Sequence, residues 1–525
     1  MPPSRRLVAV LAIVAVLAAL GGCGIGPSDR PELAVYGGPG AASASATAPT
    51  RPTGAGGPGQ QAEFSPDWGD CSGLPAVDGR AAEFAMSCAA IRVPYDYSNP
   101  TAGRLNLAVG RATAPGLPAD APPLVVLVND GPLDATLANV DRLQEIAAAL
   151  PGDITDHFAV IGIDVRGSGS SAAGVDCFYD YPVDTLFTMN ADQTTAAAHS
   201  YLNELARMFT FGCQDAVDAD MVFFNTAQVA DDLDSLRSAL GRDTIDLLGI
   251  GHGATAAAVY VDRYPGRAGH VVLDGPADSA TGPVDRAVTS AEQFERALQT
   301  FFADCAAQPD CALGADPAAT LQKAIDALDH DPLETSIAVP NSGALLWALV
   351  MALPDRDRWP DLVHAIDAAA DGDPNPVADA LTTFLADPPV QVDTRLMLGC
   401  NDTDQRISDA ELATATTTAA GKAPTFGSFL VAVSALCKLW PAPETPLGPL
   451  HGTGAPPVLV IGGVDDPVAP FAGVQAVAGQ LGSAVLVNYS GLGHGGYLHS
   501  DCIAALTDPF LLAGTLPAPG TLCAR

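Results

Sequence analysis

Three short motifs in this chain could carry acid–base or nucleophilic chemistry. One reads Gly249-Ile250-Gly251-His252-Gly253, the second carries Asp466, and the third carries His494. Each of them follows an apolar run that is typical of a buried strand. A carboxylate that orients an imidazole is the usual way to make a general base next to a nucleophile. The chain order of turn, acid and histidine therefore predicts one site, built at the carboxyl ends of three strands.

Eight apolar, β-branched runs should form the sheet that positions these motifs. The first two indicate an antiparallel pair. The other six alternate with helical patterns, which favours a mostly parallel sheet with helices on both faces. The expected strands are Ala90–Tyr97, Arg104–Gly110, Pro123–Asn129, His157–Asp164, Thr244–Gly249, Gly269–Asp274, Pro456–Gly462 and Ala484–Tyr489.

One helix before the glycine-rich turn has a clear apolar stripe, in which Val229, Leu233, Leu236 and Leu240 recur at spacings of four, three and four. We expect the charged residues between them to face solvent. These residues are Asp231, Asp232, Asp234 and Arg237.

The alternation of strands and helices stops between Asp274 and Pro456, where helical patterns such as Ala291–Ala307 dominate. An insertion that leaves from a strand end could cover a site at that end of the sheet. We therefore expect the first part of a core over 67–275, a mainly helical lid over 276–455, and the rest of the core over 456–525.

The ordered set of motifs resembles the exported actinobacterial α/β-hydrolases of the tripeptidyl-aminopeptidase-like group, in the proline-iminopeptidase clan. The resemblance implies an α/β-hydrolase fold with an eight-stranded sheet and a helical lid, and it places Asp466 as the acid and His494 as the base. The motifs that carry it are Val93–Tyr97, Asp164–Ser170, Asp231–Arg237, Val272–Gly275, Cys437 near Trp440-Pro441, Asp466–Pro470, Gly493–Gly495, and the last two cysteines, Cys502 and Cys523.

The nucleophile position departs from this family, whose members read Gly-x-Ser-x-Gly. Here Gly251 stands where the serine should be. Glycine has no side chain, so it cannot form an acyl-enzyme. Loss of the nucleophile lowers the turnover of a triad enzyme by about 10⁶.

The turn after the third strand departs as well. The family has Asn/His-Gly-Gly-Pro-Gly, whereas this chain reads Asn129-Asp130-Gly131-Pro132-Leu133. Asp130, Gly131 and His252 are expected to form the oxyanion region. A carboxylate there would oppose developing negative charge, and the two lost glycines restrict the turn.

These departures favour a catalytically impaired protein that binds a small peptide, an ester, a lipid or an envelope protein in the inherited cleft. The alternative is an active aminopeptidase or esterase that uses another nucleophile or a histidine-activated water. A third possibility is a structural envelope protein with a vestigial cleft. No cofactor is expected, and no cysteine or histidine spacing indicates a metal site.

Each of these residues could instead have a purely structural role. His494 could be a structural loop histidine, and Asp466 could cap the following helix. His252 or the serines at 168, 170 and 171 could offer a substitute nucleophile, while Arg166 more simply holds loops through ion pairs. Gly249, Gly251 and Ala254 also fit a dinucleotide fingerprint, but that fingerprint normally opens its domain, whereas here several strands precede it.

The N-terminus predicts export and lipid anchoring. Residues 1–22 have a basic start and an apolar run from Leu7 to Leu20, which is short for a membrane span. The Leu-Gly-Gly-Cys sequence resembles a lipobox, with Cys23 as the lipidated residue. Residues 23–66 are rich in Gly, Ala, Pro, Ser and Thr, and predict a flexible linker.

The other ten cysteines form an even set, as in exported proteins with disulfides. The residues leave many pairings open, and pairing in sequence order is our prediction, because it closes five short loops. The cysteines are Cys71, Cys88, Cys177, Cys213, Cys305, Cys311, Cys400, Cys437, Cys502 and Cys523.

Composition excludes two classes of partner. The 60 acidic and 25 basic side chains give a formal net charge of −35. Phosphate backbones and anionic lipid surfaces both require basic patches, so nucleic-acid binding and electrostatic membrane binding are not expected. The membrane should be reached through the lipid anchor only.

Overall fold

A computed structural model describes residues 65–128, 139–171, 175–177, 184–329, 339–386 and 392–524 of the chain. Several predicted features lie outside these residues. They are the signal peptide, Cys23, almost all of the linker, and residues 129–133 of the predicted oxyanion turn. None of the helices in the described ranges is both long and apolar enough to span a bilayer.

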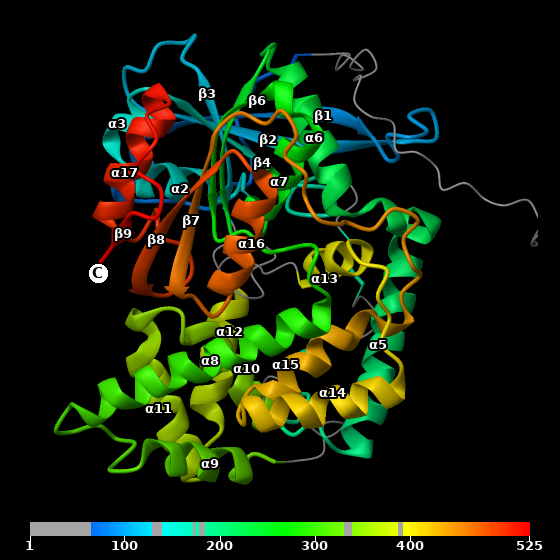
Figure 1. The fold of residues 1–525 in the computed structure, drawn as a ribbon, viewed down its shortest axis with the longest axis vertical. Coiled ribbons are helices and arrows are strands. Elements are labelled where there is room, and N and C mark those ends of the chain that lie inside the picture. The colour runs from blue at the N-terminus through cyan, green and yellow to red at the C-terminus, as the bar shows by residue number, and fades with distance from the viewer. Residues whose placement is uncertain are drawn as a thin grey trace, which may run out of the picture. The chain divides into compact units, whose positions relative to one another are not determined.

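A nine-stranded sheet forms the core, in the order β1-β2-β4-β3-β5-β6-β7-β8-β9 (Figure 1). All eight expected strands are present, and the α/β-hydrolase fold is confirmed. The sequence reading missed β9, which has only two residues and pairs with β8. The strands are β1 (Ala85–Pro94), β2 (Arg104–Thr113), β3 (Pro123–Val128), β4 (Ala159–Ile163), β5 (Ile245–Ile250), β6 (Ala268–Asp274), β7 (Val458–Asp465), β8 (Ala484–Leu492) and β9 (Leu522–Cys523).

The pairing follows the expected plan. β1 and β2 are antiparallel over ten residue pairs, and β2 pairs antiparallel with β4. From β4 to β9 every neighbouring pair is parallel. Parallel strands need crossover connections, and helices supply them. The carboxyl ends of β5, β6, β7 and β8 consequently share one edge of the sheet.

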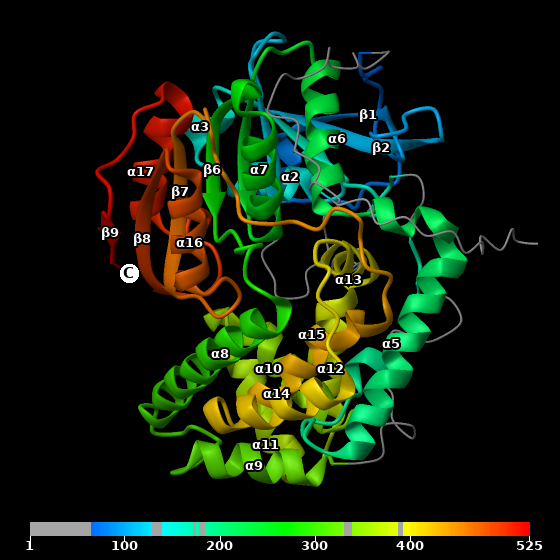
Figure 2. The same ribbon diagram turned by 45° about the vertical axis from the view of Figure 1, so that its right-hand side comes forward.

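Helices cover both faces of the sheet (Figure 2), and its central strands, β3 to β7, are largely buried. One apolar cluster joins the sheet to α6 (Thr226–Ala239), α7 (His252–Arg263) and α16 (Phe471–Leu481). The opposite cluster joins it to α2 (Leu143–Ala149), α3 (Gly152–Thr155) and α17 (Asp501–Ala513). Short 3-10 segments complete the core at η1 (Gly79–Glu83), η2 (Asp218–Phe223) and η3 (Pro265–Arg267).

Two glycines allow α7 to pack closely on the sheet. A Cβ built on Gly249 would lie 2.6 Å from the Ala254 Cα, and one built on Gly253 would lie 2.0 Å from the Leu127 carbonyl oxygen. These glycines are therefore explained by close helix–strand packing. β5 also lies in the middle of the sheet and follows four other strands, so the dinucleotide interpretation has no support in this topology.

The expected solvent-facing side of α6 is wrong for two of its four charged residues. Asp231 and Asp232 are buried, with 4% and 1% exposure. Arg166, itself fully buried, donates two hydrogen bonds of 2.8 Å to Asp232, and Arg263 pairs with Asp231 at 2.8 Å. The expectation failed because helical periodicity marks a polar face but does not show whether an arginine from another segment covers it. The structural role expected for Arg166 is confirmed.

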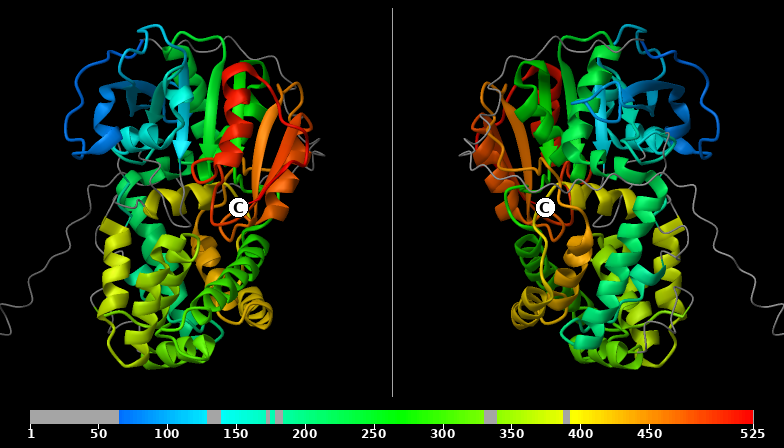
Figure 3. Two further views of the ribbon diagram at one scale, coloured as in Figure 1. Left: turned by 90° about the vertical axis from the view of Figure 1, so that its left-hand side faces the viewer. Right: turned by 90° about the vertical axis from the view of Figure 1, so that its right-hand side faces the viewer.

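The lid is helical, and it draws on two segments instead of one (Figure 3). A single apolar cluster unites the long insertion between β6 and β7 with helices that precede α6. Sequence reading placed the earlier helices in the core. The lid elements are α4 (Asp184–Phe187), α5 (Ala196–Val217), α8 (Pro283–Ala306), α9 (Pro317–Ala327), α10 (Ser342–Ala352), η5 (Arg356–Arg358), α11 (Trp359–Ala370), α12 (Asn375–Ala386), α13 (Val392–Asn401), α14 (Asp409–Lys422), α15 (Gly427–Ser434) and η6 (Ala435–Leu439).

All ten cysteines outside the N-terminal segment pair in sequence order, as predicted. The disulfides are Cys71–Cys88, Cys177–Cys213, Cys305–Cys311, Cys400–Cys437 and Cys502–Cys523. Disulfides of this kind form in oxidising compartments, which places the folded body outside the cytoplasm.

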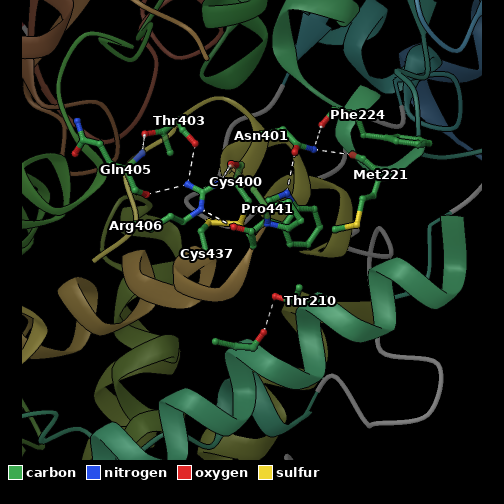
Figure 4. Close-up of a disulfide and its surroundings, with 12 residues drawn as sticks. Thr210, Met221, Phe224, Cys400, Asn401, Thr403, Gln405, Arg406, Cys437 and Pro441 are labelled. Carbon is green, nitrogen blue, oxygen red and sulfur yellow. Dashed lines mark hydrogen bonds between the residues drawn. A yellow bond between two sulfur atoms is a disulfide. The ribbon is translucent and has the colours of Figure 1, made fainter. Parts of the chain in front are cut away.

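The Cys400–Cys437 bridge ties the end of α13 to η6 (Figure 4). Arg406 supports the same junction, because its guanidinium donates to five backbone carbonyls. Two of these belong to Cys400 and Pro441, each at 2.9 Å. The others belong to Thr403, Gln405 and Trp440, each at 2.8 Å. The end of α13 is therefore held by one disulfide and by the hydrogen bonds that the Arg406 guanidinium donates.

Candidate functional site

Gly251 occupies the sharp turn between β5 and α7. Its backbone angles are φ 60° and ψ −123°, a conformation that side chains disfavour and glycine accepts. The Gly251 N–H donates to the Asp274 carbonyl at 2.8 Å, and the Gly251 carbonyl accepts from Ala254 at 3.1 Å. The turn lies between a central strand and a helix, as does the elbow that presents a nucleophile in α/β-hydrolases. The backbone has the form of that elbow, and the side chain is absent.

Asp466 and His494 meet across the ends of β7 and β8. His494 Nδ1 lies 2.8 Å from Asp466 Oδ2, and both side chains are buried. Asp466 Oδ1 accepts hydrogen bonds from the N–H groups of Val468 and Ala469, at 2.8 and 2.9 Å. Asp466 therefore caps the following segment and orients the imidazole at the same time. The two interpretations of Asp466 from the sequence are compatible.

Asp274, at the end of β6, supports the loop that carries His494. Its Oδ2 accepts hydrogen bonds of 2.8 Å from the backbone N–H groups of Gly496 and Tyr497. Burial raises the pKa of this carboxyl. The next residue, Gly275, leaves room for the imidazole, because a Cβ there would lie 3.0 Å from His494 Cε1. Sequence reading identified this motif but gave Asp274 no role in the site.

A cavity of about 170 Å³ brings the elbow and the imidazole together. Gly251, His252 and His494 line it from the core. The lid completes it with apolar side chains, which are Phe294, Trp347, Val350, Leu430 and Val433. The site therefore lies between the carboxyl ends of the strands and the helical lid, where the insertion was expected to cover it.

The other candidates divide between the cavity and the framework. His252 lines the cavity, and its Nε2 lies 3.4 Å from Thr226 Oγ1. Burial, together with Arg395 and Arg286, holds the pKa of His252 well below its usual value, so the ring stays neutral. Asp130 and Gly131 lie outside the described residues.

The serines near β4 belong to the framework. The Ser168 hydroxyl donates to the Val165 carbonyl, and the Ser171 hydroxyl donates to the Asp164 carbonyl at 2.8 Å. The Ser170 N–H donates to the Asp164 carboxylate, also at 2.8 Å. None of the three is among the residues that line the cavity beside Gly251, so a substitute nucleophile from this segment has no support.

Sequence reading missed the polar residues that the lid contributes. Arg395 on α13 lines the cavity together with Gly251 and His494, and Ser290 on α8 reaches it with a hydroxyl that donates to the Pro467 carbonyl at 2.6 Å. These residues come from separate helices with no motif of their own. Only the fold brings them to the motifs that the sequence made visible.

This arrangement can orient a base and enclose an apolar ligand. Gly251 supplies no hydroxyl for attack. Among the described residues there is no cluster of His, Cys, Asp or Glu side chains that could hold a metal ion. The site therefore combines a buried carboxylate and imidazole in contact with a turn residue, Gly251, that has no side chain.

Comparison with known proteins agrees with this geometry. Residues 423–523 match the family model described as TAP-like protein. The chain is 26% identical to serine protease Hip1 of Mycobacterium tuberculosis over 83% of its own length and 87% of that protein. It is 29% identical to carboxylesterase B of the same organism (83% and 86%), and 24% identical to tripeptidyl aminopeptidase of Streptomyces lividans (87% and 86%). The chain thus has an α/β-hydrolase fold, and its residues 423–523 match the TAP-like family model.

Proposed function

We propose that this protein is a pseudo-hydrolase that binds a small ligand in the inherited cleft and does not hydrolyse it. The observation that carries the proposal is Gly251. It occupies the turn where α/β-hydrolases carry their nucleophile, and it has no side chain. A triad without its nucleophile loses about 10⁶ in turnover.

The retained parts of the site support binding as the remaining role. Asp466 and His494 keep a buried 2.8 Å contact, and His494 lines a cavity to which the lid contributes apolar side chains. A concave, mostly apolar cavity with a few converging polar groups is the usual form of a small-molecule site. The altered turn at Asp130 supports the same proposal, because a carboxylate near an oxyanion opposes the charge that develops during acyl transfer.

The protein would act at the cell envelope. The lipobox-like Leu-Gly-Gly-Cys sequence supports lipidation at Cys23, and a linker would separate that anchor from the folded body. The five disulfides agree with a place outside the cytoplasm. Mass spectrometry of the membrane fraction should find a diacylglyceryl group on Cys23. A Cys23→Ala variant should lose membrane association and keep its fold.

The test of the function compares the wild-type protein with His494→Ala on short-chain esters and aminopeptidase substrates. We expect neither protein to exceed the background rate, because no nucleophile is present. Turnover by the wild type that His494→Ala abolishes would overturn the proposal. That result would favour the alternative, in which the histidine activates a water molecule or another nucleophile.

A further inference from the structure

A second, larger cavity of about 440 Å³ adjoins the first. The two cavities share lining residues on the core and on the lid, so they lie side by side. The shared residues include Ser290, Arg395, Leu430, Val433 and Val468. The larger cavity lies among α8, α13, α15 and α16, and most of its lining is apolar. A ligand at the elbow could therefore extend into it.

Two arginines line this space, although the chain has only 25 basic residues and a net charge of −35. Arg395 has no hydrogen bond and no ion pair within 4 Å to any residue that the structure describes. Arg286 donates through Nη1 to the backbone carbonyls of Asp278 and Thr281, and its other nitrogens have no partner among the described residues. Burial and their mutual repulsion lower the pKa of Arg395, yet a guanidinium stays charged.

The nearby carboxylates do not neutralise these arginines directly. Asp402 accepts hydrogen bonds from the Thr226 N–H at 2.8 Å and the Thr226 hydroxyl at 2.6 Å. Asp278 accepts from Ala280, Thr281 and Gln480. Neither carboxylate lies within 4 Å of a guanidinium nitrogen of Arg286 or Arg395. Arg286 and Arg395 are partly buried, and neither forms an ion pair with a carboxylate of the described residues. A partly desolvated positive charge of this kind favours an incoming anion.

We propose that the two adjacent cavities bind an organic carboxylate with an apolar tail, with the carboxylate at Arg395 and Arg286. The planar guanidinium is suited to a carboxylate because it donates two parallel hydrogen bonds. The tail would lie against Phe294, Trp347 and Val350 of the first cavity. The N-terminus of α7 opens on the same cavity and also favours negative charge. This inference rests on the proposed binding function and names the class of ligand.

Isothermal titration calorimetry of the full chain with octanoate and octanamide tests the proposal. The two probes have the same tail and differ in charge. We expect octanoate to bind at least tenfold more tightly, and Arg395→Gln to remove that difference. Equal affinities of the wild type for the two probes would overturn the proposal without any variant.

A matched control lies on α8, which carries both Arg286 and the exposed Arg296. Arg286→Gln should weaken octanoate binding severalfold, whereas Arg296→Gln should leave it unchanged. A loss of equal size in both variants would show a general charge effect and would contradict the assignment. Ester turnover is measured in a separate assay. If the protein hydrolyses esters and still binds octanoate more tightly than octanamide, only the proposed function is overturned. If it does not hydrolyse esters and binds the two probes equally, only this inference is overturned.

Discussion

The two halves of the candidate site differ in the side chains that they provide. The half at β7 and β8 keeps a buried acid and imidazole in contact at 2.8 Å, with the acid also capping the next segment. The half at β5 keeps the backbone of the elbow and lacks the attacking group. Asp466 and His494 have structural partners that depend on them. A side chain at residue 251 would add backbone strain and would not stabilise the fold.

The two halves also differ in what their side chains contribute to stability. A serine at residue 251 must hold a backbone conformation that costs of order 1–3 kcal/mol. Glycine removes that cost. Removal of Asp466, in contrast, would leave buried donors without an acceptor. Stability alone would therefore favour glycine at residue 251 and aspartate at residue 466.

The largest expected effect comes from Gly251→Ser. The acid and the base are already oriented, so we expect ester hydrolysis to rise by about 10³-fold or more over the wild type, below the ~10⁶ that a nucleophile contributes in an intact triad. Initial rates with a short-chain ester measure this gain.

The double variant Gly251→Ser with His494→Ala is the control for this prediction, and it should return to the background rate. If the single variant folds but does not hydrolyse the ester, residue 251 and His494 are not positioned to act together. The altered turn at Asp130 would then be the second lesion.

The strands and the motifs of the core could be predicted from the sequence, because each is marked by a pattern of residues that are close together in the chain. Apolar runs marked eight strands, and the cysteines paired in their order along the chain. β9 escaped notice because two residues carry no periodicity. Arg395 was missed for a different reason. It reaches the cavity from a lid helix about 140 residues beyond the elbow, and only tertiary packing gives it a role.

The next effect concerns stability. Asp466→Ala should lower the free energy of unfolding by about 3 kcal/mol, because Val468, Ala469 and His494 would all lose a buried acceptor. Denaturant unfolding measures the change. Asp465→Ala is the matched control, since that neighbouring side chain is exposed and should cost under about 0.5 kcal/mol. Equal losses in the two variants would remove the structural reason for retaining the acid.

A pH effect should appear at the lid side of the site. Burial raises the pKa of Asp402 to about 6. The unfolded chain releases this proton near pH 4 and the folded chain near pH 6, so the stabilising effect of the protonated carboxyl is lost as the pH rises between these values. Relative to Asp402→Asn, the wild type should lose about 2 kcal/mol from pH 4 to 6, allowing for partial exposure. Parallel pH profiles for the two proteins would contradict the raised pKa.

The smallest effect isolates backbone strain at the elbow. Gly251→Ala adds a Cβ without a hydroxyl, at a φ of 60°. We expect a loss of about 1–2 kcal/mol in the free energy of unfolding, with no gain in hydrolysis. Gly314→Ala is a comparison at a φ of 73° with open space around the Cβ. If Gly251→Ala is neutral while Gly314→Ala is destabilising, strain does not explain the glycine at the elbow.

The central claim is that residue 251 occupies the nucleophile position beside His494, and that its missing side chain prevents acyl transfer. Covalent labelling with a fluorophosphonate, read by mass spectrometry of the peptide that contains residue 251, tests it most directly. We predict no adduct on the wild type, an adduct at residue 251 of Gly251→Ser, and none on that variant when His494→Ala is added. An adduct on the wild type that depends on His494, or no adduct on a folded Gly251→Ser protein, would contradict the claim.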